Sequence, residues 1–106
     1  MSDARNSRDE RRRKAQRKQV LELLKSGKVL VASVDAPGRQ DVRRTVSVER
    51  SAQGVRVHVE HYHPWEWDRT LDEAEQHFAS PEAALEALEK EWAVHWSQLH
   101  EPSVPR

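Results

Sequence analysis

The chain has 106 residues, and its 18 basic and 18 acidic side chains balance to a formal net charge of zero. Only 36% of the residues are hydrophobic, which is enough for one small core but leaves part of the chain outside it. The absence of cysteine excludes disulfides and thiol chemistry. With no signal-peptide pattern and no apolar run near the ~20 residues of a membrane span, we expect a cytoplasmic protein without membrane contact.

The charge is unevenly distributed along the chain. Residues 1–28 hold ten basic and four acidic side chains, whereas the remaining 78 residues hold eight basic and fourteen acidic ones. Such a division is typical of a basic arm that contacts something negative. The cations that we predict to contact nucleic-acid phosphates, with little sequence preference, are Arg11, Arg12, Arg13, Lys14, Arg17 and Lys18.

The arm itself has the pattern of a helix. A capping box from Ser7 to Glu10 precedes good helix formers that continue to Lys25, and Gly27 can supply the left-handed residue that follows a helix. Residues 1–18 contain nothing to bury, so we expect an exposed or partly disordered arm. The apolar side chains expected to dock on the body are Val20, Leu21 and Leu24.

Three strands are predicted next in the chain. Residues 28–34 are rich in β-branched side chains, and a proline-glycine turn follows them. Residues 42–50 and 55–63 both alternate apolar and polar side chains, with a turn around Gly54 between them. We therefore expect the last two strands to form a hairpin.

The register of this hairpin follows from the alternation. If Val48 faces Val57, then Val46 faces Val59, and a slip by one residue would place the valines in water. The outer face then brings together favourable cross-strand partners. These pairs are Glu49 with Arg56, Thr45 with Glu60, and Arg43 with Tyr62.

Residues 64–78 allow two interpretations. Leu71, Ala74 and Phe78 have helical spacing, which favours a helix. Three strands alone give a long helix little surface to pack on, which favours a fourth strand over residues 73–78. We lean slightly towards the strand.

The most clearly patterned stretch is Ser80 to Leu99. Ser80 is a good N-cap and Pro81 a good first helical residue. One continuous helical stripe follows, formed by Leu85, Leu88, Trp92, Trp96 and Leu99. The sequence therefore predicts an α+β domain over residues 19–100, with a tail over residues 101–106. It is a small antiparallel meander of three or four strands, with a long C-terminal amphipathic helix on one face and a basic N-terminal helix.

Two exposed-looking tryptophans form a second candidate site. Trp65 and Trp67 lie in a loop with proline and acidic residues, which is unusual for a plain connector. Such a loop can present an aromatic anchor to a protein partner. Because tryptophan is highly buried on average, we also expect at least one of the two to fold back over the core.

A third pattern is the histidine-rich stretch from His58 to His63, which also contains Glu60. His61 and His63 point the same way on a strand, and with His77 they suggest a zinc or nickel site. Without cysteine or a fixed third ligand, we assign no metal ligands and no cofactor. No nucleophile elbow, zinc-protease motif or phosphate-binding glycine loop is present. We therefore predict a non-enzymatic protein without a small-molecule substrate.

Two functions fit this sequence. One is a small binding module that associates with nucleic acid through the basic helix. The other is a protein-interaction or self-association domain that forms a homodimer, because a small sheet has exposed edges.

Overall fold

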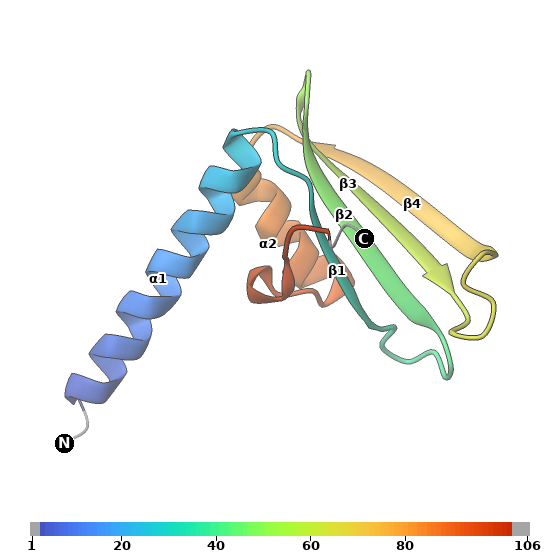
Figure 1. Cartoon of the computed structure of the whole chain (residues 1–106), viewed down its shortest axis with the longest axis horizontal. Helices are drawn as coiled ribbons and strands as arrows, with labels where there is room; N and C mark the ends of the chain where they lie inside the picture. The colour runs from blue at the N-terminus through green and yellow to red at the C-terminus, as the bar shows by residue number, and fades with distance from the viewer. Residues whose placement is uncertain (1–2, 103–106) are drawn as a thin grey trace.

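The protein forms a four-stranded antiparallel sheet with its two α-helices on one side (Figure 1). The computed structural model describes residues 3–102, with side chains described from residue 10 onward. The elements are α1 (Asp3–Lys25), β1 (Leu30–Asp35), β2 (Arg43–Ser51), β3 (Gly54–Tyr62), β4 (Thr70–Phe78), α2 (Pro81–Trp92) and the short 3₁₀ helix η1 (Trp96–Gln98). The strand order β1-β2-β3-β4 is a meander, so the predicted α+β class is confirmed. Side chains 1–9 of the predicted arm and residues 103–106 of the predicted tail lie outside the described residues.

The β2–β3 hairpin has the predicted register. Val48 lies opposite Val57 and Val46 opposite Val59, and all four are fully buried. The turn depends on Gly54, whose φ of +132° favours glycine. A Cβ at this position would lie 2.1 Å from the carbonyl oxygen of Phe78, so the close approach of the next strand also requires glycine.

The ambiguous segment before the last helix is a strand. β4 begins at Thr70, earlier than the expected 73–78, and pairs with β3 along its whole length apart from a bulge at His61 and Tyr62. Pairing satisfies the backbone groups along the edge of β3, which outweighs the helical spacing of Leu71 and Ala74. Every residue of β4 except its last is exposed.

The last helix is shorter than predicted. α2 has 12 residues and ends at Trp92, because Ala93 adopts the left-handed conformation (φ 53°). The N–H of Val94 donates back to the carbonyl of Leu88 (3.0 Å), and the Val94 side chain is fully buried. In a continued helix Val94 would lie on the polar face, so the break buries an apolar side chain that the long helix would expose. The prediction of one helix to Leu99 is therefore wrong.

The core lies between the inner face of the sheet and the helices. Leu24 of α1, Leu30 of β1, and Leu88 of α2 are at most 1% exposed, and they pack together with the central valines. Each such side chain contributes roughly 1.5–3 kcal/mol on burial. Val20 is also buried and Leu21 partly buried, so the predicted docking of the end of α1 is confirmed.

The two edges of the sheet differ. A short segment at His100 pairs with Val31 of β1 through two backbone hydrogen bonds of 2.7 and 2.9 Å. β4 has no strand on its outer side within residues 3–102. Across these same residues, no helix combines the length and the apolar character needed to cross a membrane.

Candidate functional site

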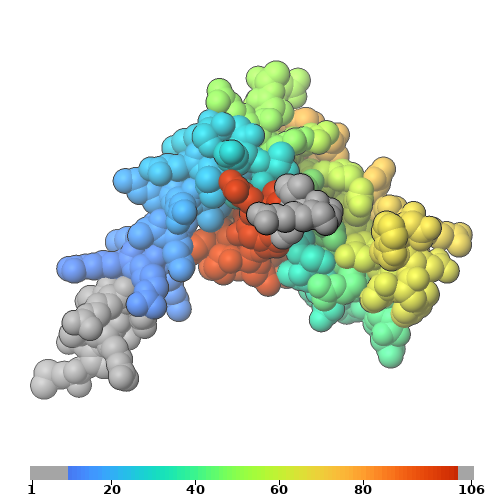
Figure 2. Space-filling model, viewed as in Figure 1, coloured from blue at the N-terminus to red at the C-terminus, as the bar shows by residue number. Residues whose placement is uncertain are grey.

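The N-terminal half of α1 projects away from the body of the molecule (Figure 1), and the side chains that follow residue 9 stand out from the body in Figure 2. Every side chain from Glu10 to Gln19 is exposed. The structure therefore places all the predicted phosphate-contacting residues in solvent, namely Arg11, Arg12, Arg13, Lys14, Arg17 and Lys18. Among the described side chains, no carboxylate lies within ion-pair distance of these six.

Helical periodicity separates these cations by direction. Arg11, Lys14 and Lys18 follow one another at spacings of three and four residues, and therefore share one face of the helix. Val20 and Leu24 dock on the opposite side. We call the outward set of Arg11, Lys14 and Lys18 the basic stripe.

Arg17 differs from the basic stripe because it faces the body. It lines a hollow together with Glu86 and Glu89 of α2 and with Trp96. The acidic face of α2 thus lies beside Arg17, and this cation is less available to an external anion than the basic stripe is.

The tryptophan loop between β3 and β4 lies at the other end of the molecule from the start of α1 (Figure 1). Trp65 is 63% exposed and Trp67 is 78% exposed, so the expectation that at least one folds over the core is wrong. Trp65 stacks instead on His63, with ring centroids 4.6 Å apart and an interplanar angle of 6°. The basic stripe and the tryptophan loop are therefore separate surfaces.

The histidines considered as metal ligands do not converge. His61 is buried on the inner face and contacts Asp72, whereas His63 lies beyond the strand and contacts the backbone carbonyl of Asp41 (2.9 Å). His77 pairs in register with Arg56 on the outer face of the sheet. These three side chains therefore do not form one site.

His61 belongs instead to a chain of polar contacts that closes one end of the core. Arg44 donates to Nε2 of His61 (2.9 Å) and to the carbonyl of Trp92 at the end of α2. Because arginine can only donate, Nε2 accepts, and the proton on Nδ1 is donated to Asp72 (2.6 Å). Both nitrogens of the imidazole are therefore occupied within the fold.

This chain also changes the acidity of its members. Burial lowers the pKa of Arg44, and the nearby charge of Arg39 lowers it further. Partial burial raises the pKa of Asp72, but hydrogen bonds from Arg39 (3.0 Å) and His61 lower it more, so its net pKa is below the ordinary value. The carboxylate of Asp72 is thus held in its ionised form.

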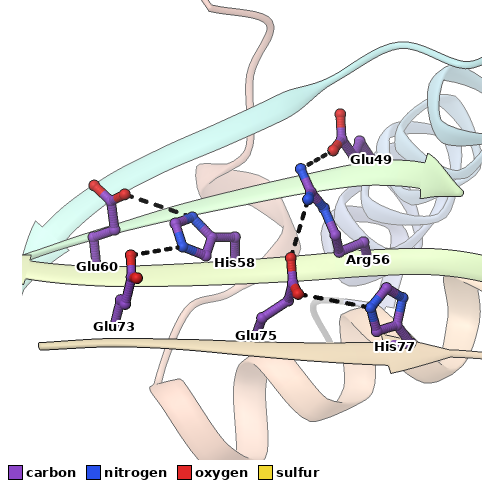
Figure 3. A network of polar contacts seen from close by, with 7 residues as sticks. All are labelled: Glu49, Arg56, His58, Glu60, Glu73, Glu75 and His77. Carbon is purple, nitrogen blue, oxygen red and sulfur yellow. Dashed lines mark hydrogen bonds and ion pairs between the residues drawn. The ribbon is translucent and has the colours of Figure 1, made fainter.

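The outer face of β2, β3 and β4 carries an extended polar network (Figure 3). One half of it is organised around Arg56, which forms ion pairs with Glu49 and with Glu75 (3.0 Å). His77 approaches the other oxygen of Glu75 at 3.8 Å. In this half, a permanent cation lies beside both carboxylates.

The other half of the network has no such cation. His58 and Glu60 are two residues apart on β3 and share its outer face, and Glu73 of β4 lies directly opposite Glu60. Nδ1 of His58 is 3.6 Å from Glu60, and Nε2 is 3.2 Å from Glu73. One potential ligand atom from each of the three residues lies within 4.8 Å of the others. The sequence indicated His58 and Glu60 but not Glu73, because its placement depends on the β3–β4 register.

The chain matches no protein-family model, no curated protein and no solved structure at a significant level.

Proposed function

We propose that the protein is a non-enzymatic binding module that associates with nucleic acid through α1. The observation that supports this proposal is the basic stripe, which is exposed on a projecting helix with no acidic residue between Arg11 and Gln19. A helix with its side chains is about 10–12 Å across, which suits the ~12 Å major groove of B-DNA. Lysine and arginine contacts to phosphate need no base readout, so we expect little sequence preference.

The charge of the rest of the molecule favours this mode of approach. The chain after residue 28 carries a surplus of six acidic side chains, so phosphate groups would be repelled by the body and attracted by the arm. The helix would therefore enter the nucleic acid while the sheet points away. Neutralised phosphates release counterions, so binding should fall steeply as salt concentration rises.

Fluorescence anisotropy of labelled single- and double-stranded DNA and RNA tests this proposal. The variant replaces the basic stripe with glutamine, as Arg11→Gln, Lys14→Gln and Lys18→Gln. A matched control removes three exposed cations from other regions, as Lys28→Gln, Arg69→Gln and Lys90→Gln. Each protein is titrated at several salt concentrations.

We expect the stripe variant to bind more weakly and to lose about one unit of salt slope per lost phosphate contact. The control should keep both the affinity and the slope of the unmodified chain. Absence of binding by the unmodified protein at low salt would overturn the proposal. Equal weakening in both variants would show that the attraction is not specific to the helix.

Self-association is a second candidate function, favoured by the state of β4. This strand is paired on one side only within the described residues, and its positions 70–77 are exposed on both faces. An unpaired strand presents backbone donors and acceptors to a second chain. Two copies related by a two-fold axis can pair antiparallel through β4.

Light scattering at low and high salt distinguishes this candidate from association through the arm. β4 carries Asp72, Glu73 and Glu75, so screening of their mutual repulsion should favour edge pairing at high salt. An arm that binds the acidic body of another copy should instead dissociate under the same conditions. A monomer at every salt concentration and protein concentration tested would exclude both.

A further inference from the structure

The outer polar network contains two carboxylates that face each other across neighbouring strands. Glu60 and Glu73 face each other directly across β3 and β4, and like charges at such positions destabilise a sheet. Among the described residues, His58 is the one basic group within ion-pair distance of either carboxylate. In the neighbouring half of the network, by contrast, the permanent cation of Arg56 pairs with both Glu49 and Glu75.

We propose that His58, Glu60 and Glu73 form a binding site for a divalent transition-metal ion. Zinc binds imidazole nitrogen and carboxylate oxygen at about 2.0–2.2 Å, so neighbouring ligand atoms of a bound ion lie roughly 3–3.5 Å apart. Nε2 of His58 lies 3.2 Å from Glu73 and meets this spacing, whereas the 3.6 Å contact to Glu60 is made by the other ring nitrogen, Nδ1. Because one ion binds one ring nitrogen, Glu60 has to turn towards the nitrogen that faces Glu73, and one donor atom of each residue already lies within 4.8 Å of the others.

The backbone fixes the three ligands on rigid elements. His58 and Glu60 are two residues apart on β3, which places both on the outer face, and Glu73 reaches the same place from β4. Inner-face neighbours Val57 and Val59 are fully buried, so β3 cannot slip without exposing them. The core thus determines the separation of the ligands.

The donor set indicates the class of ion. One imidazole with two carboxylates suits zinc, cobalt or nickel, whereas magnesium and calcium prefer oxygen donors alone. The ligands all come from the sheet surface, and the side chain of Glu73 is 61% exposed, so water completes the coordination. A metal ion would supply the positive charge that this half of the network lacks.

A proton competes with the metal for the same place. Each nitrogen of His58 points at a different carboxylate, so a doubly protonated imidazole can donate to Glu60 and Glu73 together (Figure 3). Metal binding requires a deprotonated ring nitrogen. The ion and a proton therefore exclude one another at the ring nitrogen that binds.

Isothermal titration of untagged full-length protein with zinc chloride tests the site, with cobalt absorption as a spectroscopic check. We expect one saturable ion per chain and at least about tenfold weaker binding for His58→Ala and for Glu73→Gln. His77→Ala is the matched control, because this histidine lies on the same outer face but in the half that contains Arg56. His63→Ala controls for binding at the loop. Circular dichroism in the presence of a chelator confirms that each variant is folded.

The result that supports the proposal is a loss confined to His58→Ala and Glu73→Gln, with both controls unchanged. Absence of saturable zinc and cobalt binding at neutral pH would overturn it. An equal loss for every histidine removed would also overturn it, because that pattern describes scattered binding by surface imidazoles. These measurements are independent of nucleic-acid binding, since the basic stripe is intact in all four variants.

Discussion

The two faces of the sheet are formed by the same strands, but one is buried and apolar while the other is polar and accessible to solvent. On the inner face of β3, Val57 and Val59 are fully buried beneath α2, while on the outer face His58 and Glu60 of the same strand remain accessible to solvent. Burial on one side fixes the register, and the register then fixes which polar groups meet on the other side. The inner face determines the fold, and the outer face can carry chemistry without contributing to the core.

The largest loss of stability is expected from a cavity beneath the inner face of the sheet. Leu88→Ala removes a fully buried side chain of α2 and should lower the free energy of unfolding by about 2–5 kcal/mol. Glu89→Ala, at the next and exposed position, should change it by no more than about 0.5 kcal/mol. Chemical denaturation measures both values. Similar losses for the two variants would show that α2 does not cover the core as described.

The turn that joins β2 and β3 should show the next largest effect. Gly54→Ala places a Cβ against the carbonyl of Phe78 at a φ of +132°, so we expect a loss of about 1–3 kcal/mol. Gly38→Ala is the control, since its φ is +74° but nothing lies within 4 Å of an added Cβ. It should lose only about 1 kcal/mol. Equal thermal shifts would mean that β4 moves aside without penalty.

Asp72 contacts His61 near the end of α2, and its contribution to the stability of the fold should depend on pH. Its pKa in the folded protein is below the ordinary 3.8, so its stabilising contribution is complete well above that pH. This contribution is lost as the pH falls through the folded pKa. Because the carboxylate is largely exposed, Asp72→Asn should lower stability at neutral pH by no more than about 1 kcal/mol.

Unfolding of Asp72→Asn and of the unmodified chain across acidic and neutral pH measures this difference. The gap between the two proteins should narrow on acidification. A gap that stays constant to low pH would show that Asp72 contributes through its neutral hydrogen bonds alone.

The smallest expected effect concerns the outer face without metal. At about pH 8 in a chelator, Glu73→Gln removes one of two facing like charges and should raise stability by a few tenths of a kcal/mol. Glu75→Gln breaks an ion pair with Arg56 instead, and should lower stability by a similar amount. A gain of stability for Glu73→Gln together with a loss for Glu75→Gln would show that the two halves of the network differ in charge balance. Stability changes of the same sign for both variants would contradict this difference.

The β2–β3 hairpin could be predicted from the sequence, because the alternation of apolar and polar residues specifies which side chains face the core. Val46 and Val48 fix the pairing with β3, and an error of one residue would have exposed both. The end of α2 could not be predicted in this way, since Ala93 is not a residue that marks a left-handed cap. The one available signal was Val94, an apolar residue on what would have been the polar face of a longer helix.

The candidate sites also divide into one that local sequence predicts and one that depends on the pairing of distant residues. The exposure of the basic stripe followed from the lack of large apolar side chains between Glu10 and Val20, which is a local property of the sequence. The grouping of His58 with Glu73 depends on a pairing between residues far apart in the chain, together with a bulge near Tyr62. Local composition cannot supply that register, so the site appears only in the structure.

The two edges of the sheet differ in their backbone pairing, and this difference affects how several copies of the chain could assemble by strand addition. The edge of β1 is paired at Val31 with the segment at His100, whereas β4 has no strand on its outer side within the described residues. If two copies join through β4, each copy uses its unpaired edge, and both ends of the combined sheet are β1 strands that carry a His100 segment at Val31. The backbone groups of Val31 are then already bonded at each end, so further strand addition there would first have to displace the His100 segment.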